Sequence, residues 1–483
     1  MNFGSAQPNI PGRGILAAYS PRFWLLVAAI GVVAGLAGAA LMGLLRAVQH
    51  LAWSYRSGDF LSGVEQTSGG HRVLVLAVGG VVAGGGVVLL KRWAPGGGEV
   101  SEALWLRRAR LPLVASFARA VHSIVIVALG ASLGREAAPQ QAGAATASAL
   151  SDWAGLPEWQ RRLLVACGAG AGMAAVYNVP LGGALFALEV LLGTLALPLV
   201  LPALACTMIA TAVAWVALPS GPTYSIPSYP VSASLVVWAL LVGPLAGLAA
   251  VGYIQLITRA HALRPRGRLA LAAPIAVFLA LGALAIAYPQ VLGNGKSVVQ
   301  LALVGKLSLA LLAVLLVLKP LATAACLGSG APGGLFTPTL ASGVLLGGLL
   351  GWAWSQLWPG APLGAYAIVG GAAVLGAAMQ GPLAAVVLLL ELTHRADALM
   401  VPILLAVVGA TIVARLLGAP SIYAARLPPG EQTATAGDAD GAPGQPAAAD
   451  ATPTGEPAAA ETTPPRPAPD DPSGDPRKSL SRT

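Results

Sequence analysis

The sequence has 483 residues, of which 56% are hydrophobic and only 10% are charged, whereas charged residues make up about 25% of a typical soluble domain. Several apolar runs reach the roughly 20 residues that a helix needs to cross a bilayer. This composition excludes a soluble globular protein and predicts an all-α polytopic membrane protein. The net charge of +9 is unevenly distributed, because residues 428–483 are acidic on balance and the part before them is basic.

The chain divides into three parts. Residues 1–22 lack the apolar core and cleavage site of a secretory signal, and we predict an N-terminal cytoplasmic segment there. Residues 23–427 are the predicted membrane domain. Residues 428–483 are rich in Ala, Pro, Gly, Thr and Asp and cannot bury enough surface to fold alone, so we predict a disordered tail. The apolar segments of the membrane domain lie near residues 24–53, 73–91, 111–133, 162–195, 197–218, 230–257, 268–288, 305–327, 340–357, 364–392 and 398–418.

The charged pair Arg135-Glu136 follows an apolar segment directly. Charged residues at membrane depth are costly, and most of them have a function. Gly134 before the pair and Pro139 after it predict a helix start, where free backbone N–H groups can hold an anion. Glu136 could then occupy the place of a permeant anion and leave it when protonated. The alternative is a purely structural ion pair between Arg135 and Glu136.

A second interrupted helix is predicted at Gly333-Gly334-Leu335-Phe336-Thr337-Pro338. Its glycines allow close approach of the backbone, and the N–H groups of Leu335 and Phe336 could converge on an anion. A re-entrant turn without a ligand is the alternative.

An internal repeat relates two halves of the membrane domain, about residues 23–218 and 230–427. The run 180–189 matches the run 382–391 at an offset of 202, with Pro-Leu at the start and Glu at the end of each. Corresponding interrupted segments in two halves indicate a binding site at the middle of the membrane in transporters. Chance similarity between two helices rich in Ala, Gly and Leu is the alternative.

The remaining polar residues allow more than one interpretation. Glu189 and Glu391 end the matched helices, and each could face the binding site, face water or pair with an arginine. Tyr423 follows the last apolar segment and could donate a hydrogen bond to an anion or anchor the chain at the membrane interface. No second His or Cys lies at helical spacing from His122, and no nucleotide or nucleophile motif is present. We therefore expect no metal, no cofactor, no nucleic-acid partner and no enzyme activity.

Taken together, Gly-Arg-Glu at 134–136, the 178–189 run, Gly-Gly-Leu-Phe-Thr-Pro at 333–338 and the late Tyr423 resemble the CLC family of chloride channels and proton-coupled anion antiporters. The resemblance covers about residues 20–427. It implies an inverted-repeat fold with broken and re-entrant helices, one anion path per subunit, and a homodimer. It also implies that Glu136 is the external gating glutamate. The expected anion-binding residues are Pro95, Gly96, Arg135, Ala137, Gly334, Leu335, Phe336, Thr337 and Tyr423.

Three positions depart from the family pattern. The segment 94–99 corresponds best to the family's Gly-Ser-Gly-Ile-Pro-Glu, which places Pro95 where a serine usually faces the ion and is similar to the nitrate-preferring pattern. Ala137-Ala138 stands where a glycine is usual, as in divergent bacterial members that include fluoride exporters. Val190 occupies the position of an inner glutamate that proton-coupled members often carry, and this leaves Glu189 as a possible proton route.

From these observations we predict a CLC-type protein of the cell inner (plasma) membrane that moves chloride and is gated by Glu136. It could act as a voltage-gated-type channel or as a weakly proton-coupled antiporter. Two alternatives stay open. One is an antiporter of the same fold that is selective for fluoride or nitrate, and the other is a non-transporting membrane scaffold whose acidic tail recruits partners.

Overall fold

The structure is a computed structural model that describes residues 19–427 except residues 56, 97 and 107. The predicted tail and most of the predicted N-terminal segment lie outside the described residues. Within the described part all regular elements are helices, and the only β-type pairing is an isolated bridge between Gly134 and Gly334. The expectation of an all-α fold is therefore confirmed.

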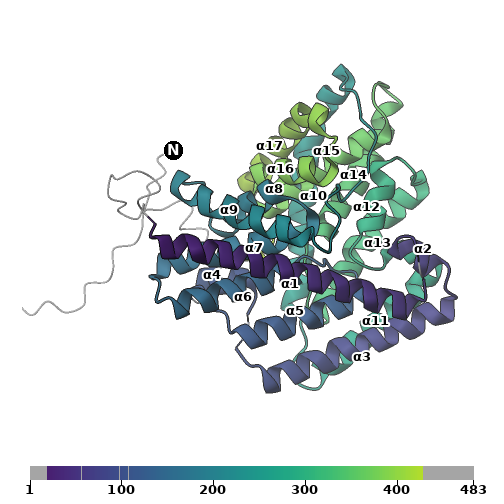
Figure 1. Ribbon diagram of the computed structural model, residues 1–483. Coiled ribbons are helices and arrows are strands. Elements are labelled where there is room, and N and C mark those ends of the chain that lie inside the picture. Colours follow the sequence, from purple (N-terminus) through teal and green to yellow (C-terminus); the bar gives the residue numbers. More distant parts are fainter. Residues whose placement is uncertain (1–18, 56, 97, 107, 428–483) are drawn as a thin grey trace, which may run out of the picture.

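The helices fall into two sets, one from each half of the sequence, coloured purple to teal and teal to yellow in Figure 1. The first set is α1 (Pro21–Trp53), α2 (Phe60–Glu65), α3 (Gly69–Trp93), α4 (Val100–Leu106), α5 (Leu113–Ala128), α6 (Ala137–Trp153), α7 (Glu158–Tyr177), α8 (Pro180–Leu185) with the π-helix Phe186–Leu191, and α9 (Leu197–Ala214). The second set is α10 (Ala233–Ala262), α11 (Leu269–Ala287), α12 (Lys296–Leu303), α13 (Leu309–Gly328), α14 (Phe336–Ser355), α15 (Leu363–Met379), α16 (Pro382–Thr393) and α17 (Met400–Leu416).

Eight helices in the described part are long and apolar enough to cross a membrane. They are α1, α3, α9, α10, α11, α13, α14 and the helical stretch that contains α17. The other apolar helices are shorter, and α8 and α16 are among them. This mixture of full-length and short helices confirms the expected polytopic fold with broken helices.

Close helix packing is repeated in the two halves. Helix α1 packs against α9, and α10 packs against α17. Gly31 and Gly35 of α1 face backbone carbonyl groups of α9, while Gly243 and Gly247 of α10 face those of α17. The glycines allow the helix backbones to approach closely, as small residues do in membrane helix pairs. The sequence repeat therefore corresponds to a repeat of packing.

Two predicted apolar segments are each split into two helices. The segment 162–195 breaks at Asn178, and the segment 364–392 breaks at Gln380; both residues adopt left-handed backbone conformations with φ near 58° and 57°. A proline follows two residues later in each case and starts the next helix, a position that suits proline because its missing N–H is not needed there. These breaks create α8 and α16.

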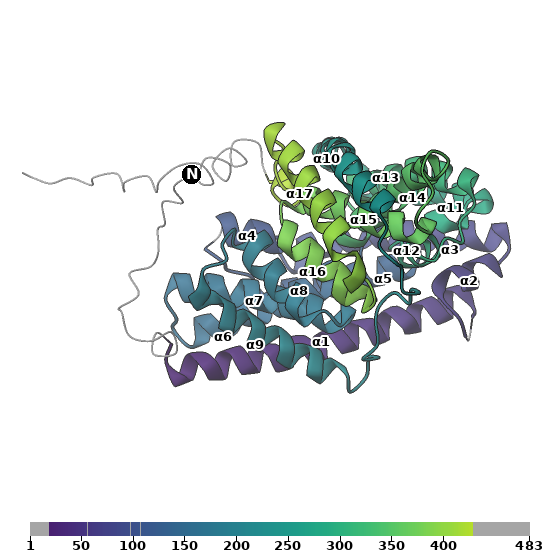
Figure 2. The same ribbon diagram turned by 90° about the horizontal axis from the view of Figure 1, so that it is seen from above.

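The two halves meet along several contacts. Helix α8 lies beside α16, and α3 of the first half packs along α11 of the second, as Figure 2 shows. Helices α6 and α14 begin at the predicted breaks, with Glu136 and Leu335 as the residues that precede them. Both of these residues are buried inside the protein.

Gly35 offers a test of the packing between α1 and α9. A Cβ at Gly35 would lie 2.5 Å from the carbonyl oxygen of Ala210, so we expect Gly35→Ala to destabilise the protein by about 1–3 kcal/mol and to lower its thermal unfolding midpoint in detergent. Gly43 lies on the same helix with nothing within 4 Å of its added Cβ. The control Gly43→Ala should leave the midpoint unchanged or raise it, because alanine favours helix over glycine. Equal midpoints for both variants would contradict this packing.

Candidate functional site

The two interrupted helices meet through a pair of backbone hydrogen bonds. The Gly134 N–H donates to the carbonyl oxygen of Gly334 at 2.7 Å, and the Gly334 N–H donates to the carbonyl oxygen of Gly134 at 2.8 Å. Each glycine lies just before the start of its helix, α6 or α14. This bridge therefore holds the N-termini of both helices close together at the centre of the protein.

The carboxylate of Glu136 lies at the start of α14, the helix of the opposite half. It accepts a hydrogen bond from the Phe336 N–H at 2.7 Å, from the Tyr177 hydroxyl at 3.1 Å and from the Thr337 hydroxyl at 3.3 Å. The Glu136 residue is only 1% exposed. A buried carboxylate requires such donors, and backbone N–H groups at a helix start are suited to an anion. The Glu136 carboxylate, itself an anion, is therefore held by donors at the start of α14.

The absence of side chains at Gly134 and Gly334 makes room for Glu136. A Cβ atom added to either glycine would collide with the carboxyl group of Glu136. Glycine at both positions thus permits the carboxylate to reach the N–H groups of α14.

Arg135 does not pair with Glu136 among the described residues. Its guanidinium carbon lies 5.0 Å from the centre of the Tyr177 ring, a distance at which a cation is attracted to an aromatic face. The Tyr177 hydroxyl in turn contacts Glu136. Arg135 therefore supports the site through Tyr177, and the alternative of a structural Arg135–Glu136 ion pair does not describe this geometry.

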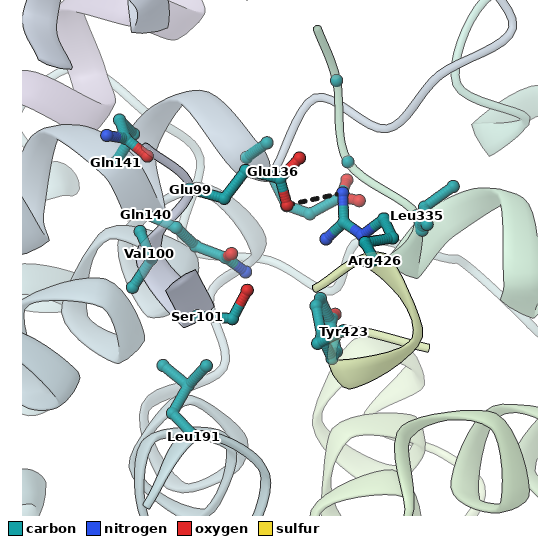
Figure 3. Close-up of a pocket in the computed structure, with 13 residues that line it drawn as sticks. Glu99, Val100, Ser101, Glu136, Gln140, Gln141, Leu191, Leu335, Tyr423 and Arg426 are labelled. Atoms are coloured by element: carbon teal, nitrogen blue, oxygen red, sulfur yellow. Dashed lines mark ion pairs between the residues drawn. The ribbon is translucent and has the colours of Figure 1, made fainter. Parts of the chain in front are cut away.

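A cavity of about 50 Å³ borders Glu136, large enough for a few water-sized particles. It is shown in Figure 3. Residues from both halves line it: Glu99, Val100, Ser101, Glu136, Ala137, Gln140, Gln141, Leu191, Gly333, Gly334, Leu335, Tyr423 and Arg426.

Most of the residues expected from the sequence come together here. Five of them line the cavity, namely Glu136, Ala137, Gly334, Leu335 and Tyr423. Phe336 and Thr337 donate hydrogen bonds to the Glu136 carboxylate. Arg135 does not contact the carboxylate but lies against the ring of Tyr177. These eight residues come from segments about 290 positions apart in the sequence, and the fold brings them to one place.

Pro95 and Gly96 lie elsewhere. Both are exposed where the chain turns at the end of α3, and neither lines the cavity. The chain becomes buried again at Gly98, and Val100 and Ser101 at the start of α4 line the cavity instead. The glycine-rich segment 94–99 can be aligned with the family pattern in more than one register. In the structure, the hydroxyl residue that this part of the chain contributes to the cavity is Ser101.

Several contributors were not expected from the sequence, among them Tyr177, Ser101, Glu99 and Arg426. The sequence indicates a role for Tyr177 only weakly: it is a single tyrosine at the end of a helix that is rich in small residues. Glu99 and Arg426 are 327 positions apart, so no local pattern could have paired them. Arg426 lies three residues after Tyr423, which was expected in the site, and this proximity is the one feature of the sequence that could have indicated Arg426.

Glu189 and Glu391 have a reciprocal arrangement outside the cavity. Glu189 accepts hydrogen bonds from the N–H groups of Leu383 and Ala384 at 3.1 and 2.6 Å, at the start of α16. Glu391 accepts them from Leu181 and Gly182 at 3.0 and 2.6 Å, at the start of α8. Each carboxylate thus satisfies free N–H groups of the matched helix in the other half.

Comparison with known proteins places this architecture among membrane proteins of one family. The model of the voltage gated chloride channel family matches residues 79–415. A protein of Ralstonia nicotianae that bears the name "Putative chloride channel protein ClcB-like" is 35% identical over 415 residues, which are 83% of this chain and 96% of that protein. The voltage-gated ClC-type chloride channel ClcB of Salmonella typhimurium is 32% identical over 422 residues, with 83% and 98% covered.

Solved structures share the fold at lower sequence identity. The structure of a slow cyanobacterial Cl⁻/H⁺ antiporter superposes with a TM-score of 0.74 at 20% identity and covers 84% of this chain and 97% of its own. A CLC-type fluoride/proton antiporter superposes with a TM-score of 0.68 at 21% identity, with 84% and 97% covered. These likenesses confirm the inverted-repeat architecture.

The reciprocal caps lead to a prediction of equal effects in the two halves. Glu189→Ala and Glu391→Ala should each destabilise the protein by about 1–2 kcal/mol, the usual effect of losing a helix N-terminal cap, and should lower the thermal midpoint in detergent by similar amounts. The Gln variants should lose less, because an amide oxygen still accepts a hydrogen bond.

The control for these variants is Glu158→Ala. Glu158 makes a long, exposed ion pair with Arg108 at 3.8 Å, and such pairs contribute little to stability. A midpoint for Glu189→Ala or Glu391→Ala that equals that of the control would contradict the capping role.

Proposed function

We propose that this chain, which belongs to the voltage-gated chloride channel family, moves chloride or a similar small anion across the membrane. The observation that carries the proposal is the carboxylate of Glu136, which is held by the Phe336 N–H and two hydroxyl groups at the border of a small cavity. Backbone N–H and hydroxyl donors at a helix start are suited to holding a small anion. The ClcB-like relatives are named chloride channels, which supports chloride as the cargo.

In this proposal Glu136 is the gating glutamate. Its carboxylate acts as a tethered anion that blocks the site while it is bound to Phe336, Tyr177 and Thr337. A permeant anion competes for the same donors, and protonation of the carboxylate weakens its hold because a neutral acid is a poorer acceptor. Ala137, Gly334, Leu335 and Tyr423 then form the walls of the anion path, and Arg135 adds positive charge nearby.

Proton coupling is proposed to be weak or absent. Val190 cannot carry a proton, and the neighbouring Glu189 is bound to two N–H groups of α16 and does not line the cavity. A proton route through Glu189 would require its carboxylate to leave α16. This favours a channel or a weakly coupled antiporter over a tightly coupled one.

We further propose the inner (plasma) membrane as the location and a homodimer as the assembly. The loops at 107–110 and 259–268 are rich in arginine, and the positive-inside rule places such loops in the cytoplasm. Helices α8 and α16 are too short to span a bilayer and expose Leu181 and Leu383, which are 50% and 46% exposed. In the homodimer that the resemblance implies, a second copy of the chain would cover these two exposed leucines.

The proposal is tested with purified protein in liposomes loaded with chloride. Under a gradient the wild type should release chloride, and Glu136→Ala should still release it while any accompanying proton movement disappears, because the tethered carboxylate is gone. Simultaneous recording with chloride and pH electrodes measures both. Chloride release equal to that of empty liposomes would reject chloride as the cargo, and release by the wild type would exclude a pure scaffold.

A cargo of fluoride is the second candidate. Ala137-Ala138 at the start of α6 departs from the usual glycine pattern, and one structure with this fold is a fluoride/proton antiporter. A nitrate preference has less support, because it was suggested by Pro95, which lies outside the cavity lining.

Efflux rates of chloride, fluoride and nitrate from one preparation distinguish these cargoes. We expect chloride to pass fastest, since Ser101 and Tyr423 both line the cavity and can donate hydrogen bonds to a large halide. Faster fluoride efflux would replace chloride with fluoride in the proposal, and faster nitrate efflux would replace it with nitrate.

A further inference from the structure

An ion pair lines the same cavity as Glu136. The Glu99 carboxylate lies 2.8 Å from a guanidinium nitrogen of Arg426, as the dashed line in Figure 3 shows. Glu99 directly precedes α4, and Arg426 lies three residues after Tyr423. Both side chains border the cavity, so the pair joins the first half to the end of the second half at its wall.

Glu99 lies in strongly positive surroundings. Besides Arg426, the guanidinium groups of Arg264 and Arg119 are close enough to act on its charge. Burial alone would raise the pKa of Glu99, but these positive charges outweigh it and the pKa lies below its usual value. Glu99 is therefore ionised at neutral pH and places a negative charge beside these basic residues.

Arg426 keeps unused binding capacity. Its side chain is only 7% exposed, and its Nε has no hydrogen-bond partner among the residues that the structure describes. A guanidinium group has five N–H donors and can bind more than one anionic group. The geometry is that of a cationic site inside a cavity, neutralised by a carboxylate of the protein.

We propose that Glu99 is a second tethered anion on this pathway. Its carboxylate occupies an anion-binding position at Arg426, and a permeant anion binds Arg426 when the carboxylate swings toward solvent. The Glu99 side chain is 38% exposed, so it has space to move away while Arg426 stays in place. This inference rests on the proposed anion transport and adds a binding position for the anion at the Arg426 end of the cavity.

A purely structural ion pair is the competing explanation, and the chain contains a matched example. Arg161 and Asp152 also lie 2.7 Å apart, with side chains 8% and 44% exposed, but neither lines the cavity. A structural role predicts the same behaviour for both pairs, whereas a tethered anion predicts a change in anion binding for Glu99 alone.

The test is chloride titration of the purified full-length protein by isothermal calorimetry, with gluconate keeping the ionic strength constant. Glu99→Gln keeps the shape and removes the charge, and it should bind chloride about two- to fivefold more tightly, the range that a partly exposed ion pair supplies. Asp152→Asn should bind chloride as the wild type does. The gain should disappear in the double variant Glu99→Gln/Arg426→Gln.

Unchanged or weaker chloride binding in Glu99→Gln would overturn the inference, and so would an equal gain in Asp152→Asn or a gain that survives in the double variant. If Glu99→Gln does not yield folded protein, Glu99→Asp shortens the side chain and should tighten chloride binding in the same direction, and an unchanged affinity would overturn the inference. Binding is measured here without transport, so absent chloride flux in liposomes would reject the proposed function without deciding this inference.

Discussion

The structure depends on one contact, in which a carboxylate of the first half binds the start of a helix of the second half. The first N–H groups of α14 have no partner within the helix, and the carboxylate of Glu136 is almost completely buried and needs hydrogen-bond donors. The hydrogen bond from Phe336 to Glu136 resolves both problems at once. It is possible because the Gly134–Gly334 bridge fixes the two chains at close range and because both glycines leave space for the carboxyl group.

The same kind of contact, a carboxylate at the start of a helix of the other half, occurs twice more, at Glu189 and Glu391. The contact of Glu136 differs from these two in a way that suits the proposed ion exchange. Glu189 and Glu391 are related by the repeat, so each carboxylate has its own helix start in the other half. Glu136 has no such counterpart: the bridge pairs Gly134 with Gly334, and the residue two positions after Gly334 is Phe336. Two helix N-termini therefore face one carboxylate at the centre. We propose that a small anion uses these donors when the carboxylate leaves, whereas Glu189 and Glu391 each cap a helix of the other half.

The sequence predicts the parts of this arrangement that depend on local chemistry. The glycines and prolines around residues 134–139 and 333–338 predict where α6 and α14 begin, and the repeated run predicts the matched helices. It does not predict how Glu189 and Glu391 cap each other's helices, because that depends on the relative orientation of two halves about 200 residues apart. Pro95 was expected in the site because the alignment of a glycine-rich segment is not fixed by its sequence. In the structure Pro95 is exposed, and the chain returns to the interior at Gly98.

If an anion moves along this cavity as we propose, the charges of its lining give a reason for the two carboxylates. A path lined by arginines alone would bind an anion tightly and release it slowly, whereas conduction requires binding that is strong enough to attract the ion and weak enough to release it. In the proposed mechanism, Glu136 at the start of α14 and Glu99 at Arg426 each keep hydrogen-bond donors occupied until an anion arrives. The anion then exchanges with a carboxylate instead of entering an empty site. In this proposal, the net free energy of anion binding at each position is the difference between the binding free energies of the permeant anion and of the carboxylate that it displaces. This difference stays small enough for the ion to leave.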